Sequence, residues 1–174
     1  MVNELIAYCG PAAVPEDVWL RWNTDPVLIA ALAALAYGVA RRATHKNAGW
    51  AAIALMAVVF ISPLCALSSA LFSVRVLHHV ILVSAAAPLL ALAFPQRRAG
   101  VVPLALLAAA HAVALWVWHA PGPYAWGLAT VPGYWLMQLT LLGSAWWMWR
   151  AILANTTPNG SALVALAVTV GQMG

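Results

Sequence analysis

The chain has 174 residues, of which 65% are hydrophobic and only 7% are charged. A soluble domain carries about 25% charged residues, so this composition excludes a globular surface that faces water and predicts membrane lipid as the surrounding solvent. The net charge of +4 rests on eight Lys and Arg residues. These stand at the ends of apolar runs, where membrane topology places them, so no nucleic-acid partner is expected.

Residues 1–24 form an N-terminal segment without the basic start and long apolar stretch of a cleavable signal peptide. Residues 25–174 are the predicted transmembrane domain. A sixth apolar run begins near Ser161 and is still apolar at Gly174, so we expect it to continue in a longer chain. The predicted fold is all-α, a polytopic transmembrane helix bundle of five to six or more spanning helices. Five apolar runs approach the roughly 20 residues that a span needs, namely residues 26–41, 49–68, 74–94, 100–118 and 132–153.

The basic residues set the expected orientation. If the helices alternate in direction, only Arg21 and Arg75 fall on the side opposite to the others. Cytoplasmic loops carry the excess of Lys and Arg, so the N-terminus is predicted outside, with outer loops at 68–75 and 121–132. We expect a multi-pass protein of the bacterial inner membrane. Six basic residues share the predicted cytoplasmic side: Arg41, Arg42, Lys46, Arg97, Arg98 and Arg150.

Histidines are the main candidates for chemistry. His79, on the third apolar run, and His119, at the end of the fourth, match in depth if these two helices run antiparallel. They are the best candidates for a metal site near the outer surface, and His78 is a further one, because imidazole suits copper, zinc or haem iron. His111 lies about 12 Å deeper at 1.5 Å per residue and is expected to form a hydrogen bond between helices.

Sulfur adds one more candidate. Cys65 is predicted near the outer end of the second run, and a thiolate there would favour Cu(I). Cys9 lies in the outer N-terminal segment, so the two cysteines could also pair as a disulfide on the oxidising side. Met137 is expected only to fill space. The sequence contains no paired carboxylates, no HExxH and no carboxylate inside an apolar run, so we expect no enzyme.

Two strings resemble signatures of the CtaG family. Residues 73–82 (SVRVLHHVIL), followed by 87–90 (APLL), are similar to its HMxQH…APPLL string, and residues 116–124 (WVWHAPGPY) to its W-x-W-H-x-P-x-x-Y string. The resemblance covers roughly residues 19–174. It implies a membrane-embedded cytochrome c oxidase assembly factor that helps to deliver or insert copper into a haem–copper oxidase. It also implies copper as the bound metal and oxidase subunits as partners.

The chain departs from the first signature at two positions. His79 matches the second histidine of the signature, while Arg75 stands at the first histidine and His78 at the glutamine. A cation at Arg75 disfavours a second cation nearby. This departure favours an alternative, a structural accessory subunit of a respiratory complex without metal. A third hypothesis is a haem-binding membrane protein with His79 and His119 as axial ligands.

The topology predicts an outcome of cysteine labelling. In intact spheroplasts, a cysteine placed at Ala125 should react with an impermeant thiol reagent, because residues 121–132 are expected outside. A cysteine at Ala43 should be protected, because it lies in the basic loop on the cytoplasmic side. Labelling at Ala43 without labelling at Ala125 would reverse the orientation.

Overall fold

The computed structural model describes residues 7–96 and 102–154, and this part of the chain is helical with no strand. The all-α prediction is therefore confirmed for these residues. The predicted sixth run from Ser161, and Arg97 and Arg98 of the third loop, lie outside the described residues.

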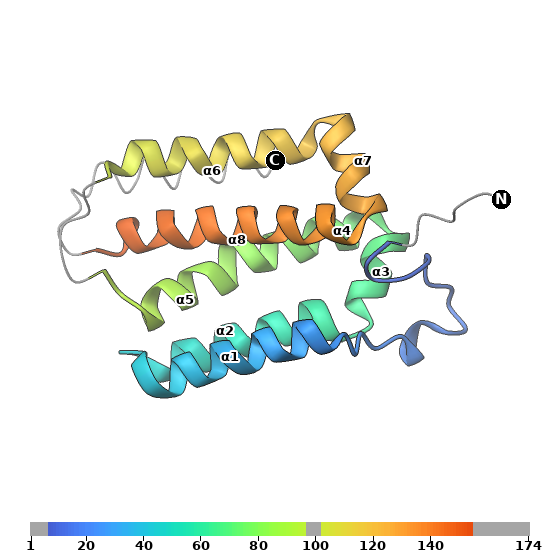
Figure 1. The fold of residues 1–174 in the computed structure, drawn as a ribbon, viewed down its shortest axis with the longest axis horizontal. Helices are drawn as coiled ribbons and strands as arrows, with labels where there is room; N and C mark the ends of the chain where they lie inside the picture. Colours follow the sequence, from blue (N-terminus) through green and yellow to red (C-terminus); the bar gives the residue numbers. More distant parts are fainter. Residues whose placement is uncertain (1–6, 97–101, 155–174) are drawn as a thin grey trace.

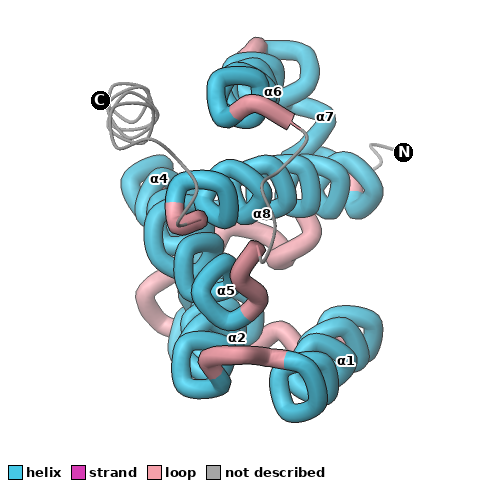
Figure 2. Tube along the Cα trace, turned by 90° about the vertical axis from the view of Figure 1, so that its left-hand side faces the viewer, coloured by secondary structure: helices cyan, strands magenta, loops and turns pink. Residues whose placement is uncertain are grey.

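The helices form stacked layers (Figures 1 and 2). The lowest pair in Figure 1, α1 and α2, packs through α2 against α5, and α5 packs against α8. The upper layer consists of α6 and α7, which both contact α8. Along the chain, the elements are η1 (Val18–Leu20), α1 (Pro26–Arg42), α2 (Lys46–Ile61), α3 (Leu64–Ala70), α4 (Phe72–Ile81), the π-helical turn η2 (Leu82–Ala86), α5 (Ala87–Ala93), α6 (Leu104–His119), α7 (Pro121–Ala129) and α8 (Val131–Ile152).

Among the described residues, one helix is long and apolar enough by itself to cross a membrane. It runs through α4, η2 and α5 as Phe72–Ala93, with 22 residues. Two further spans are possible if each bent pair counts as one, with bends of 50° between α2 and α3 and 75° between α6 and α7. Length and composition of the described helices thus identify one span and up to three. The five to six spans expected from the sequence stay a prediction.

The boundaries of two predicted loops were wrong. Residues 121–132, expected to be an outer loop, contain α7, and residues 68–75 are helical except at Leu71. Pro121 and Pro123 do not prevent α7, because the first turn of a helix has no use for their missing N–H groups. The second predicted run is likewise interrupted at Ser62 and Pro63, where α2 gives way to α3.

The starts of two helices follow from their capping residues. The Asp25 carboxylate accepts a hydrogen bond from the backbone N–H of Val27 (2.8 Å) at the start of α1, where Pro26 occupies the first turn. The Thr130 hydroxyl accepts one from Gly133 (3.1 Å) at the start of α8. Both caps satisfy backbone donors that a helix cannot satisfy itself. The predicted first and fifth runs accordingly have nearly the bounds expected.

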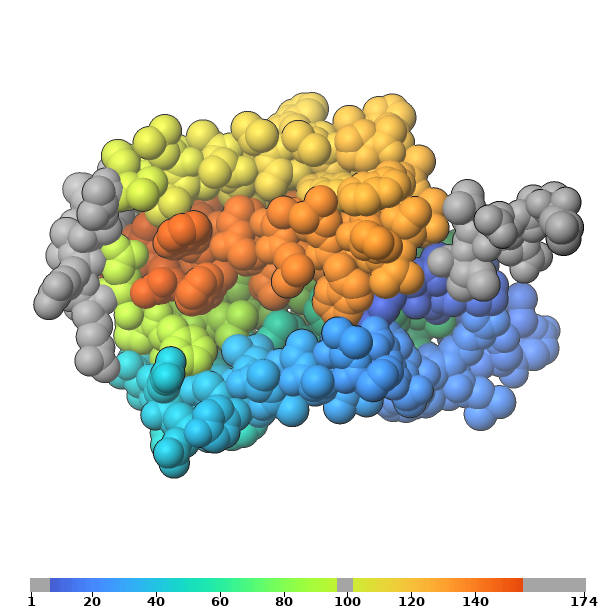
Figure 3. All heavy atoms as spheres, in the orientation of Figure 1, coloured from blue at the N-terminus to red at the C-terminus, as the bar shows by residue number. Residues whose placement is uncertain are grey.

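Apolar side chains also cover much of the described surface. Large residues on α6 and α8 are exposed, among them Val113, Trp116 and Leu139, as expected for a chain surrounded by lipid. An apolar groove of about 480 Å³ opens on the face seen in Figure 3, between α1, α5 and α8. Its lining includes Leu35, Leu90, Phe94, Leu139, Leu142 and Trp146.

Packing at Gly49 gives a test of the fold. A Cβ atom at Gly49 would lie 2.7 Å from Cγ1 of Val39 and 3.3 Å from the Cβ of Ala93. Val39 cannot turn aside, since a helical valine has one strongly preferred rotamer. We expect Gly49→Ala to lower the free energy of unfolding by about 1–3 kcal/mol, the range for overpacking, measured by thermal unfolding in detergent.

The matched control is Gly38→Ala, because nothing lies within 4 Å of a Cβ at that position in α1. It should leave the unfolding temperature unchanged or raise it. Equal destabilisation by both variants would contradict the close approach of α1 and α2 at Gly49.

Candidate functional site

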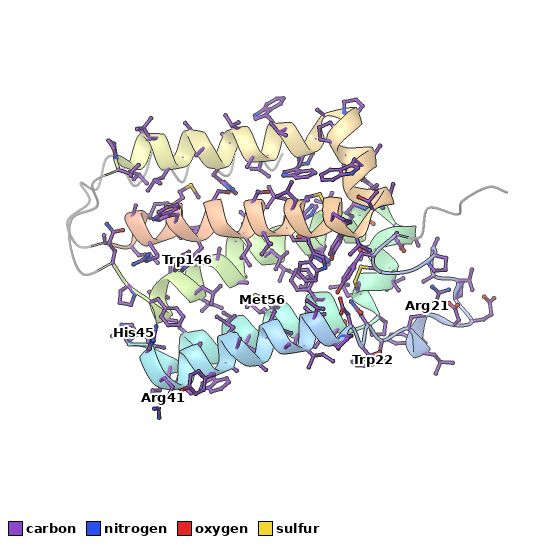
Figure 4. The ribbon with its side chains drawn as sticks, viewed as in Figure 1. Arg21, Trp22, Arg41, His45, Met56 and Trp146 are labelled. Atoms are coloured by element: carbon purple, nitrogen blue, oxygen red, sulfur yellow. A yellow bond between two sulfur atoms is a disulfide. The ribbon has the colours of Figure 1, made fainter. Side chains whose placement is uncertain are left out.

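The candidate residues gather at one end of the bundle. This end holds the α3–α4 corner, the start of α8, α7 and the N-terminal segment, at the right of Figure 1. Arg21 and Trp22 lie there, whereas Arg41 and His45 lie at the opposite end (Figure 4). The sequence predicted the same separation, with the histidine site on the side away from the first basic loop.

His78 and His79 are neighbours on α4 that face different surroundings. Successive helix positions point about 100° apart, and the two ring centroids are 5.7 Å apart. His78 is buried, with 2% of its surface exposed, and packs edge-on against Phe60 of α2 at 5.2 Å. His79 lines a small cavity together with His78 and Arg75.

His119 ends α6 with its ring fixed. Its Nδ1 is 2.6 Å from the carbonyl oxygen of Leu115, one turn earlier. Because a carbonyl can only accept, Nδ1 carries the proton and Nε2 of the neutral ring keeps its lone pair. The Nε2 lone pair of the neutral ring is therefore the one that could bind a metal ion, and the predicted approach of His79 to His119 stays a prediction. Their role as metal ligands stays a prediction.

Arg75, which stands where the family signature has a histidine, is held by oxygen acceptors. Its Nε donates to the carbonyl of Ser68 (2.9 Å) and its Nη2 to that of Ser69 (3.5 Å). Its Nη1 donates to the Tyr124 hydroxyl, and the guanidinium carbon lies 5.5 Å from the centre of the Tyr124 ring. Arg75 therefore ties the end of α3 to α7, which fixes the corner around His79.

Cys65 is not a free thiolate in this structure. It forms a disulfide with Cys9, with the two Cα atoms 5.3 Å apart, within the usual range for such a bond. The prediction of Cys65 as a metal ligand is therefore wrong for this form of the protein, because its sulfur is already bonded. The alternative that the sequence left open, pairing with Cys9, is the one observed.

The disulfide is one of several contacts that hold the N-terminal segment on the bundle. Tyr8 stacks on Tyr134 of α8 with ring centroids 4.6 Å apart, and its hydroxyl donates to Oδ2 of Asp25 (2.5 Å). Burial of Tyr8, together with this bond, raises the pKa of its phenol to about 12. The same bond lowers the pKa of the Asp25 carboxyl. Sequence reasoning missed Tyr8, since a lone tyrosine in a short segment carries no pattern.

A small cavity lies where these parts meet. Its volume is about 30 Å³, which is enough for about one water molecule or ion. Neither ring nitrogen of His78 has a hydrogen-bond partner, nor has Oε1 of Gln138, which is 3% exposed. The lining comes from the N-terminal segment, the α3–α4 corner and α8, including Tyr8, Cys9, Arg75, His78, His79, Tyr134, Met137 and Gln138.

The donor set limits what the site can hold. Within residues 7–96 and 102–154, no three His, Cys, Asp or Glu side chains are grouped as a metal site. The available donors are neutral imidazoles, one thioether and one amide oxygen. Such a set fits weak binding of a soft monovalent cation and does not fit a tightly held divalent ion, which calls for charged ligands.

His111 does not line this cavity and instead contacts Ser144 of α8. Its Nδ1 lies 2.8 Å from Oγ of Ser144 on α8. The Ser144 hydroxyl donates to the carbonyl of Leu141 (3.2 Å), so His111 is the donor in this pair. The predicted hydrogen bond between helices is confirmed.

A comparison with protein families finds one match. Residues 32–174, well over half of the chain, match the model of a family described as cytochrome c oxidase caa3 assembly factor (Caa3_CtaG). Comparison with curated proteins and with solved structures found no match. The matched region includes His79, His119 and the Arg75 corner.

The contacts of Arg75 generate a stability prediction. Arg75→Ala should lower the free energy of unfolding by about 1–3 kcal/mol, because three carbonyl and hydroxyl acceptors lose a charged donor. Tyr124→Phe, which keeps the ring and removes one acceptor, should have a smaller effect. Arg42→Ala, at an exposed position, is the control in thermal unfolding. If Arg75→Ala and Arg42→Ala unfold alike, Arg75 does not hold the corner together.

Proposed function

Because this chain belongs to the Caa3_CtaG family of cytochrome c oxidase caa3 assembly factors, we propose that it assists the assembly of a haem–copper oxidase by delivering copper. The family match over residues 32–174 is the observation that carries this proposal. In it, copper is cargo and the oxidase subunits are partners. The protein itself performs no catalysis.

The His79–His119 pair supports copper as the cargo. Nε2 of His119 keeps a lone pair because Nδ1 carries the proton, and His79 is proposed as the second imidazole ligand. Imidazole is a suitable copper ligand. The nearby Arg75 charge weakens binding of any cation, and weak binding suits an ion that must be passed on.

The proposed setting is the bacterial inner membrane, with five to six spans and the N-terminus outside. The Cys9–Cys65 disulfide supports this orientation, since such bonds persist on the oxidising side of the membrane. Arg41 lies at the end of the bundle opposite to Arg21 (Figure 4). Arg41 belongs to the loop rich in basic residues, which is expected on the cytoplasmic side, so its place agrees with this orientation. The site would then face the side on which copper reaches the oxidase.

A second candidate function has one observation in its favour. Arg75 replaces a histidine of the family signature and is fully engaged in holding α3 to α7. This suits a structural accessory subunit that stays bound to the respiratory complex without metal. Stable co-purification with the mature oxidase would favour this candidate over a transient assembly factor.

Deletion of the gene tests the proposed function. We expect deletion to lower the amount of active haem–copper oxidase in the membrane while transcription of the oxidase genes is unchanged. The double variant His79→Ala/His119→Ala should reproduce the deletion, because both imidazoles are proposed to hold the ion, and added copper should partly restore activity. Oxidase activity and haem spectra of isolated membranes are the measurements.

His45→Ala is the matched control, since His45 is exposed at the opposite end of the bundle. Normal oxidase levels in the double variant, together with a loss on deletion, would eliminate copper delivery by this pair and favour the accessory subunit. An unaffected oxidase in the deletion strain would refute the proposed function altogether. A haem absorbance spectrum of the purified protein would point to the haem-binding hypothesis instead.

A further inference from the structure

The His78 imidazole is the most unusual polar group in the described part of the chain. It is almost fully buried, and neither of its ring nitrogens has a hydrogen-bond partner. Each buried polar atom left without a partner costs about 1–3 kcal/mol, so such a group calls for an explanation, such as a bound water or ion. Packing alone does not require histidine here, because an apolar ring of the same size would fill the space beside Phe60 at lower cost.

The cavity that His78 lines contains soft donors as well. Met137, 2% exposed on α8, contributes to its wall, and so does Cys9 of the N-terminal segment. The Cys9 sulfur lies 3.8 Å from the Tyr134 hydroxyl, on the side of α8 that borders the cavity. Imidazole, thioether and thiolate together form the ligand type that selects Cu(I). Cys65 does not line this cavity.

The disulfide decides whether a negative charge at Cys9 can offset the positive charge of Arg75 in this cavity. With the disulfide closed, the cavity offers only neutral donors beside the Arg75 guanidinium, which repels a cation. With the disulfide open, Cys9 can bind as a thiolate and offset that charge. The Tyr8–Tyr134 stack and the Tyr8–Asp25 hydrogen bond do not depend on the disulfide. They keep Cys9 at the cavity after reduction.

We propose that this cavity is a Cu(I) site with Cys9, His78 and Met137 as ligands, and that it becomes competent when the Cys9–Cys65 disulfide is reduced. The proposal rests on the proposed function for the identity of the cargo. Of these ligands, Cys9 and Met137 lie outside both signature strings, and His78 stands where the first string has glutamine.

The reduction step is balanced by an external dithiol. The dithiol attacks the Cys9–Cys65 bond and is itself oxidised to a disulfide. It transfers two electrons and two protons to Cys9 and Cys65, which become thiols. Binding of Cu(I) then releases the Cys9 proton and forms a copper–sulfur bond. Thiol–disulfide exchange with an external disulfide reverses this step: the external disulfide is reduced to two thiols, taking one proton from Cys65 and one from water, and the Cys9–Cys65 bond forms again. Cu(I) then loses its thiolate ligand and is left beside Arg75, which favours release to the partner.

Two variants that break the same disulfide separate the roles of its cysteines. Cys65→Ser leaves the Cys9 thiol at the cavity, and Cys9→Ser leaves a thiol that does not line it. Cu(I) affinity is measured on detergent-purified protein without oxygen, by competition with a chromogenic chelator, before and after phosphine treatment and desalting. We expect reduced wild type and untreated Cys65→Ser to bind Cu(I) about ten-fold or more tightly than oxidised wild type and Cys9→Ser, the range for loss of one metal-site contact.

The other two ligands are tested on the reduced protein. His78→Leu and Met137→Leu should each weaken Cu(I) binding, while Met56→Leu, at another buried methionine, should not. X-ray absorption of the copper-loaded wild type should show both sulfur and nitrogen neighbours. Equal affinities of Cys9→Ser and Cys65→Ser, or of oxidised and reduced wild type, would overturn the proposal.

Failure of this site and failure of the proposed function give different results. If reduction leaves Cu(I) affinity unchanged while gene deletion still lowers the oxidase, the cavity site is wrong and the assembly function stands. If deletion leaves the oxidase unaffected, the assembly function is wrong whatever the cavity binds.

Discussion

The scarcity of water inside a membrane is the constraint on which this structure depends. Each polar group placed in the bundle needs a partner within the protein. The chain contains few charged side chains that could serve as partners, since only 7% of its residues are charged. The Trp118 indole N–H, for example, donates to the Thr140 hydroxyl (2.8 Å), and His111 donates to Ser144. Among the described residues, several buried polar atoms lack a partner, including Nε1 of Trp146 and Nε of Arg150, but His78 lacks one at both ring nitrogens and lines a cavity. A ligand is therefore to be sought beside His78.

The same constraint explains the corner between α3 and α4. A helix that turns within or near lipid exposes backbone carbonyls, and the end of α3 would leave those of Ser68 and Ser69 without donors. Arg75 reaches back to both and also binds Tyr124. A histidine at this position is shorter and could not bridge α3 and α7 in this way. Arg75 thus stabilises this corner at a position where the family signature has a histidine.

Sequence reasoning predicted the helices better than the site. The first and fifth runs have clear caps at Asp25 and Thr130, so their starts could be read locally. The helix at 121–129 was missed because two prolines suggested a loop, although both fit its first turn. The predicted proximity of His79 and His119, argued from their depth on antiparallel helices, stays a prediction. The contributions of Tyr8, Met137 and Gln138 depend on how the N-terminal segment folds over α8, and no local pattern encodes that contact.

The arrangement suggests why a carrier would use neutral ligands and a single reversible charge. A site built from carboxylates and thiolates would hold copper too firmly to give it up, whereas imidazole and thioether beside a guanidinium hold it weakly. Under the proposal above, one covalent bond between Cys9 and Cys65 changes the charge of the cavity by one unit. Because Tyr8 anchors the segment independently, that change requires no large movement of the helices. Affinity would then be set by redox chemistry at the membrane surface and not by rearrangement of a bundle that lipid keeps closely packed.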